Sequence, residues 1–245
     1  MKQIFKLKFS FTLISHSLKS IFYRYHSDKI NIIKQLMPRP KVVIDVGAHA
    51  GQVSKMISRA FSKKVKIIAI EPGLYARFIL RLSIFFNRLN NIDVLPFAVS
   101  DEQGFSFLNI PEKRKNSLGF GLSHMSNNHE DFTDRNFKTH YDYVSVTTID
   151  KIVNDLELQS VDFIKIDIEG FEYKALLGAT DTLKKYKPII YIELQRHFLA
   201  RNNDSLDDLY KLLRDLGYKS FFVRDEKLVE YQENIEEDEV FFVCN

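Results

Sequence analysis

Cysteine, tryptophan, glycine and proline are scarce in this chain of 245 residues. It contains one cysteine, Cys244, no tryptophan, nine glycines and six prolines. A single cysteine excludes an intrachain disulfide and a cysteine-rich zinc site. It also favours a reducing compartment, so we expect a cytoplasmic protein. The low glycine and proline content excludes collagen-like and low-complexity chains.

Long hydrophobic runs are absent as well. The apolar stretch nearest the start, residues 9–14, falls far short of the ~20 residues that a transmembrane helix needs. It contains serine and threonine and no small-residue cleavage site follows it, so we expect no signal peptide. Hydrophobic residues make up 45% and charged residues 27% of the chain. This balance excludes extensive disorder and, with the length, predicts one large globular domain.

Positive charge is concentrated at one end of the chain. Residues 1–41 contain nine Lys or Arg and one acid, a net charge of +8, so the remainder carries −5 of the total of +3. An acidic body does not predict a nucleic-acid surface. Apolar residues recur at helical spacing over 4–23, which indicates a basic amphipathic helix. This helix either packs on the domain or binds an anionic membrane surface, which would place the protein peripherally at the inner face of the membrane.

Beyond Pro40 the chain alternates between short apolar strands and helices. Strands are predicted over 41–46, 65–70, 92–95, 162–167 and 188–193, and helices over 52–61, 74–88, 148–158, 171–186 and 205–216. Apolar strands separated by helices are typical of a parallel sheet covered on both faces, a doubly wound α/β fold. We therefore predict a basic helical extension over 1–40 and one α/β domain over 41–245.

Two segments depart from this alternation. Strands over 105–110 and 143–147 enclose about 30 residues rich in Asn, Ser and His, which predicts an insertion over about 105–147. The chain closes with two aromatic strands over 220–223 and 240–244, which can pair as antiparallel neighbours.

A glycine-containing turn separates the first strand from the first helix. Its sequence is DVGAHAG over 45–51, and glycines there let a ligand approach the backbone while the helix start faces an anionic group. Glu71 ends the second strand, where a carboxylate can accept both hydroxyls of a ribose. Together these features predict a nucleoside-type cofactor at the carboxyl ends of the strands. Gly47, His49 and Gly51 do not fit the Gly-x-Gly-x-x-Gly spacing of dinucleotide-binding proteins.

Several motifs follow one another in a fixed order between residues 41 and 194. They are VVIDVGAHAG (42–51), AIEP (69–72), AVSD (98–101), TID (148–150), FIKIDIEGFE (163–172) and PIIYIE (188–193). This series resembles the FkbM family of methyltransferases. The resemblance implies a Rossmann-like class I methyltransferase fold with S-adenosyl-L-methionine as cofactor. It also implies O-methylation of a hydroxyl on a sugar, a glycan or a secondary metabolite.

The resemblance further implies which residues hold the cofactor, and it places Ala98 and Val99 beside the adenine. The residues that hold the cofactor are Asp45, Gly47, His49, Gly51, Glu71, Ala98 and Val99.

Three acids and a lysine lie near the ends of the later strands. Lys165, Asp167 and Glu169 alternate along one strand, and Glu193 ends the next. A positioned carboxylate can take the proton of an acceptor hydroxyl, so Asp167 or Glu169 is the predicted base, with Lys165 and Glu193 shaping the site. The alternatives are that the acids cap the following helix or hold a divalent cation. We favour a metal-free site because Lys165 competes for the carboxylates, and His197 is the reserve base.

Two other functions stay open from the residues alone. One is a nicotinamide- or nucleotide-sugar-dependent oxidoreductase on a similar sheet, which the loop spacing and the terminal strand pair disfavour. The other is a non-catalytic binding module of the same fold, which the retained acids and glycines disfavour. The expected partner is a small-molecule or glycan acceptor, and we expect the insertion to form a lid or wall of its site. The oligomeric state is not fixed by these patterns.

Overall fold

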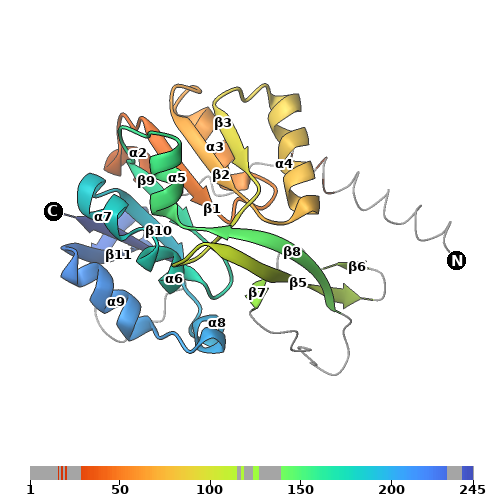
Figure 1. Ribbon diagram of the computed structural model, residues 1–245. Helices are drawn as coiled ribbons and strands as arrows, with labels where there is room; N and C mark the ends of the chain where they lie inside the picture. Colours follow the sequence, from red (N-terminus) through yellow and green to blue (C-terminus); the bar gives the residue numbers. More distant parts are fainter. Residues whose placement is uncertain are drawn as a thin grey trace, which may run out of the picture.

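The structure is a computed structural model that describes residues 16, 18, 20, 29–114, 117–118, 124–126, 139–230 and 239–244 (Figure 1). At 111–114, 117–118, 124, 126 and 139–140 the description covers the backbone alone. His16, Leu18 and Ser20 are helical, and the rest of the helix predicted over 4–23 lies outside the described residues. Within these ranges no helix combines the length and the apolar character that crossing a bilayer requires.

A sheet of eight strands forms the centre of the described chain, in the order β12-β11-β13-β10-β9-β1-β2-β3. Its parallel strands are β1 (Val42–Val46), β2 (Lys66–Ile70), β3 (Ile92–Leu95), β9 (Phe163–Ile166) and β10 (Ile189–Glu193). Its antiparallel edge consists of β11 (Tyr218–Arg224), β12 (Lys227–Glu230) and β13 (Glu239–Cys244). The five parallel strands and the terminal antiparallel pair are confirmed. The sequence analysis missed β12, a short strand that is mostly exposed and so carries no apolar run.

Helices cover both faces of this sheet (Figure 1). One face carries α5 (Ile149–Asp155), α6 (Glu172–Leu177), α7 (Thr180–Tyr186) and α9 (Leu206–Asp215). The other face carries α2 (Lys29–Leu36), α3 (Gln52–Ala60) and α4 (Leu74–Asn87). Successive strand residues point to opposite faces, so Val43 joins one apolar cluster and Ile44 the other. The predicted doubly wound α/β fold is confirmed, and its core lies in these two layers.

Helix α2 belongs to the core although it lies before Pro40. Ile32 and Ile33 are buried in the same cluster as Val43. At the start of α2, the Lys29 ammonium donates to the Tyr191 hydroxyl at 2.8 Å and forms an ion pair with Glu239. This part of the N-terminal extension therefore packs on the sheet.

The insertion and β4 (Ala98–Val99), which precedes it, form a second sheet. The other strands of this sheet are β5 (Gly104–Arg114), β6 (Ser117–Leu118), β7 (His124–Ser126) and β8 (Thr139–Thr147). Strands β5 and β8 pair antiparallel from Gly104 opposite Val146 to Pro111 opposite Thr139. Both predicted strands of the insertion are confirmed, and both are longer than predicted. Two short segments after β10, α8 (Arg196–Leu199) and a 3₁₀ turn (Ala200–Asn202), were not predicted.

One predicted helix is wrong. The segment 171–186 is two helices, α6 and α7, with Gly178 at the break. A Cβ on Gly178 would lie 2.2 Å from the carbonyl oxygen of Ser100, so the backbone of another segment passes directly against this glycine. The Asp150 carboxylate then accepts the backbone N–H groups of Asp181 and Thr182 at the start of α7. The break is therefore caused by tertiary contacts.

Replacing Gly178 with alanine tests this contact. We expect Gly178→Ala to lower the free energy of unfolding by about 1–3 kcal/mol, because a methyl group would force the two backbones apart. Gly104→Ala is the matched control, since a Cβ there meets nothing within 4 Å, and it should change the stability by less than ~0.5 kcal/mol. Urea unfolding followed by circular dichroism measures both variants. Equal stability of Gly178→Ala and the unmodified protein would contradict the account.

Candidate active site

A cavity of about 370 Å³ opens at the carboxyl ends of the parallel strands. Four of these strands and the turns that follow them supply its polar lining. Of the predicted site residues, nine line it: Gly47, His49, Glu71, Ala98, Val99, Lys165, Asp167, Glu169 and Glu193. Asp45 and Gly51 do not line the cavity, so the structure places these two behind the turn instead of at its surface.

The glycine turn lies against the end of β9. Gly47 has a φ of +71°, and a Cβ on it would lie 1.9 Å from the carbonyl oxygen of Asp167. Gly51 has a φ of +81°, and a Cβ there would lie 2.3 Å from Leu80 Cδ1. Both positions therefore require glycine for the backbone conformation and for the close contact. His49 also has a positive φ, of +49°, which histidine tolerates better than most residues.

A buried lysine connects the glycine turn to the acidic end of the cavity. Lys165 on β9 lies opposite Asp45 on β1, and its Nζ is 3.6 Å from Asp45 Oδ1 and 3.2 Å from Asp167 Oδ2. The same Nζ donates to the carbonyl oxygen of Gly47 at 2.8 Å. Burial acts to lower the pKa of Lys165, but the charges of Asp167 and Asp45 outweigh it, so the pKa is raised and the ammonium stays charged.

Asp45, on β1, supports the glycine turn from the buried side. It is fully buried, and its Oδ2 accepts a hydrogen bond from the Ser54 hydroxyl at 2.5 Å. Its other oxygen faces Lys165 at ion-pair distance, beyond the length of a hydrogen bond. The role that the structure shows for Asp45 is therefore to fix the start of α3 and the position of Lys165.

Glu71 holds two backbone segments together at the second strand. Its Oε2 accepts the N–H of His49 and its Oε1 accepts the N–H of Gly73, both at 2.8 Å. Burial raises the pKa of Glu71, although the two N–H groups act in the opposite direction. Each carboxylate oxygen has a second lone pair, so this side chain can still accept hydroxyl groups from the cavity.

Apolar side chains line the rest of the cavity. Phe97 and Ile168 join the predicted Ala98 and Val99 in this lining, and the insertion supplies Leu108 from β5 and Met125 from β7. Leu108 and Met125 were not predicted individually. Their position agrees with the prediction that the insertion forms a wall of the site.

Three carboxylates also line the cavity, on Asp167, Glu169 and Glu193. Partial burial, together with the charges of Asp167 and Glu193, raises the pKa of Glu169 to about 7. Burial and the charge of Asp167 also raise the pKa of Glu193. In the described part of the chain, no group of three His, Cys, Asp or Glu is arranged to hold a metal ion. A carboxylate with a pKa near 7 can accept a proton at neutral pH.

A fourth acid, Glu172, shapes the loop that carries Asp167 and Glu169. It is 2% exposed and accepts the N–H groups of Gly170 at 3.0 Å and Ile168 at 3.2 Å. Burial raises the pKa of Glu172 to about 7. The sequence analysis gave it no role, although a glutamate in the first turn of a helix that reaches back to the preceding N–H groups is a known capping arrangement. The reserve base, His197 on α8, is exposed and does not line the cavity.

The chain is similar to known methyltransferases in its sequence pattern and in its fold. The family described as the Methyltransferase FkbM domain matches residues 45–220. The search of curated proteins found no match. The chain is similar to the FkbM methyltransferase of Methylobacillus flagellatus KT, with a TM-score of 0.50 and 17% identity over 93% of this chain and 47% of that chain. It is also similar to an O-methyltransferase of Bacillus cereus solved in complex with SAH, with a TM-score of 0.49 and 12% identity over 95% of this chain and 88% of that chain.

The chain spans about half the length of the Methylobacillus protein, and at this identity the likeness concerns the fold alone. The family match extends over most of this chain and contains every residue that lines the cavity. Because the match is to a methyltransferase family, the alternative that this protein belongs to an oxidoreductase family is excluded. The chain belongs to the FkbM family of S-adenosylmethionine-dependent methyltransferases.

Proposed function

We propose that this protein transfers a methyl group from S-adenosyl-L-methionine to a hydroxyl oxygen of a small-molecule or glycan acceptor. The observation that carries the proposal is the composition of one cavity. The glycine turn, Glu71, apolar side chains and three carboxylates line the same cavity. A donor and an acceptor can therefore lie side by side within it.

The glycine turn, Glu71 and the apolar lining suit the donor. Gly47 leaves the turn without a side chain, and Glu71 keeps lone pairs for the two ribose hydroxyls. Phe97, Ala98 and Val99 provide an apolar surface for the adenine ring. When bound, S-adenosyl-L-methionine supplies an electrophilic methyl group on its sulfonium. The residues of the chain have to hold an acceptor oxygen in line behind that methyl group and remove its proton.

Glu169 is the better supported of the two predicted bases. Its pKa of about 7 makes it the stronger proton acceptor, and it lines the cavity next to Asp167 and Glu193. Asp167 is fixed by its ion pair with Lys165, which suits a group that orients the hydroxyl by accepting a hydrogen bond. Glu193 raises the pKa of Glu169 through its charge and so supports the base.

The electrostatics of the site bear on the acceptor. The lysine at the cavity is buried and paired with Asp45 and Asp167, while three carboxylates face the acceptor end. Anionic acceptors such as nucleic acids are disfavoured by these charges, and neutral hydroxyl compounds such as saccharides are favoured. We place the reaction in the cytoplasm, in line with the single cysteine.

Transfer of a labelled methyl group tests the function directly. We expect the purified protein to move tritium from methyl-labelled S-adenosyl-L-methionine to at least one member of a panel of saccharides and phenols. Mass spectrometry should place the new methyl group on oxygen. Omission of the acceptor is the control. Binding of S-adenosyl-L-methionine without transfer to any member would favour a non-catalytic binding module.

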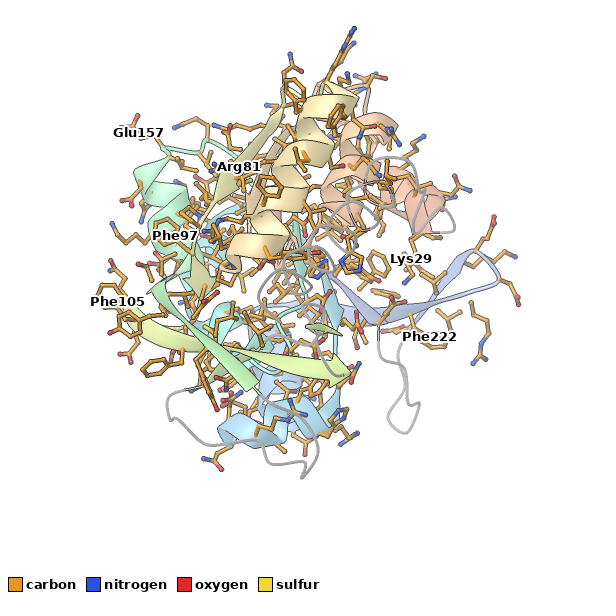
Figure 2. The ribbon with its side chains drawn as sticks, turned by 90° about the vertical axis from the view of Figure 1, so that its right-hand side faces the viewer. Lys29, Arg81, Phe97, Phe105, Glu157 and Phe222 are labelled. Carbon is orange, nitrogen blue, oxygen red and sulfur yellow. The ribbon has the colours of Figure 1, made fainter. Side chains whose placement is uncertain are left out.

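The pH dependence of transfer tests the base. Glu169 must be ionised to accept a proton, so we expect kcat/KM to fall as the pH drops below about 7 and to level off above it. Glu169→Gln should slow transfer by about 10²–10⁴ and abolish this inflection, while the Kd for S-adenosylhomocysteine changes by only a few-fold. Glu157→Gln, at an exposed position beyond α5 (Figure 2), is the matched control. An unchanged pH profile in Glu169→Gln would assign the base elsewhere.

A further inference from the structure

The outer face of α4 exposes large apolar side chains to solvent. Leu74 is 69% exposed, Phe78 48% and Phe85 74%, and Phe86 beside them is 60% exposed. Leu74, Phe78 and Phe85 are separated by four and seven residues, so they lie along one line of the helix over about 16 Å. Figure 2 shows α4 facing the viewer, with side chains projecting from this face. A contiguous row of this kind marks an interaction surface.

Basic side chains surround this row. Arg81 is exposed between Phe78 and Phe85, and α4 contains no acidic residue. At the C-terminal end of the helix, Arg88 is exposed, Arg59 donates to Asn87, and Lys63 donates to the Arg88 carbonyl oxygen at 2.7 Å. The acid on the adjacent strand, Asp93, already forms an ion pair with Lys66. The face is therefore both aromatic and cationic.

Two described residues of the N-terminal segment, His16 and Ser20, contact α4. His16 Nδ1 is 3.0 Å from the Tyr75 hydroxyl on α4. Ser20 donates to the Ala50 carbonyl oxygen at 2.7 Å, and Lys55 on α3 donates to the Ser20 carbonyl. Residues 1–41 carry a net charge of +8. Leu18, on the same segment, is 50% exposed.

We propose that the outer face of α4, defined by Leu74, Phe78, Arg81 and Phe85, docks on the surface of an anionic lipid bilayer. Aromatic side chains enter the boundary between headgroups and acyl chains, and the arginines and lysines contact lipid phosphates. A second copy of the chain fits less well, because a two-fold contact would bring the arginines of both copies together without an unpaired acid. The end of the docked face at Leu74 is three residues from Glu71, which lines the cavity, so this end of the face lies beside the cavity. This proposal goes beyond the methyl transfer and does not rest on it.

Vesicle sedimentation with the full chain tests the proposal. We expect binding to vesicles of phosphatidylcholine with phosphatidylglycerol, weak binding to phosphatidylcholine alone, and weakening by salt. Phe78→Ser with Phe85→Ser should lower the partition coefficient about tenfold or more, because two apolar anchors are lost. Phe105→Ser with Tyr143→Ser is the matched control and should bind like the unmodified protein. Both control residues are 67% exposed, and they stack on each other in the insertion, away from α4.

Three results would overturn the proposal. They are no binding to the anionic vesicles, equal binding of the α4 variant and the unmodified protein, and a dimer that the α4 variant converts to a monomer in light scattering. The last result would assign the face to a contact between two copies. Circular dichroism confirms that the variants are folded. Deletion of the N-terminal residues through 37 is unsuitable because it would remove α2, whose Ile32 and Ile33 belong to the core.

Discussion

The buried ammonium group of Lys165 holds together the edge of the sheet that lines the cavity. It pairs with Asp45 on one strand and with Asp167 beyond the end of the next, and it donates to the carbonyl oxygen of Gly47 between them. An unpaired charge at this depth would cost several kcal/mol, so the lysine fixes its partners. The glycine turn and the acidic loop therefore lie against each other, and the close contact of Gly47 with Asp167 follows from the same arrangement.

Carboxylates have two distinct tasks around this edge. Glu71 and Glu172 accept backbone N–H groups and fix the turns on either side of the cavity. Asp167, Glu169 and Glu193 face the cavity, where partial burial together with the charge of Asp167 raises the pKa of Glu169 and of Glu193. The first group makes the site rigid, and that rigidity keeps the second group at a spacing where a carboxyl can titrate near neutral pH.

The parallel strands of the sheet could be predicted from the sequence, because each of them is a short apolar run buried on both faces, as in β2. The break between α6 and α7 could not be predicted from the sequence, because its cause is the contact of Gly178 with the backbone of Ser100, which is far away in the sequence. Leu108 and Met125 could not be assigned to the cavity without the pairing of the insertion strands. The loop motif grouped Asp45 and Gly51 with the ligand-facing residues, since spacing alone does not separate a residue that touches a ligand from one that supports the turn.

Calorimetric titration of the purified protein with S-adenosylhomocysteine, with NAD as the control, tests the central claim most directly. The cavity lining and the family predict binding of S-adenosylhomocysteine with a Kd in the micromolar range and no binding of NAD. Binding of NAD, or of neither compound, would contradict the assignment of the glycine turn and Glu71 to a methyl donor.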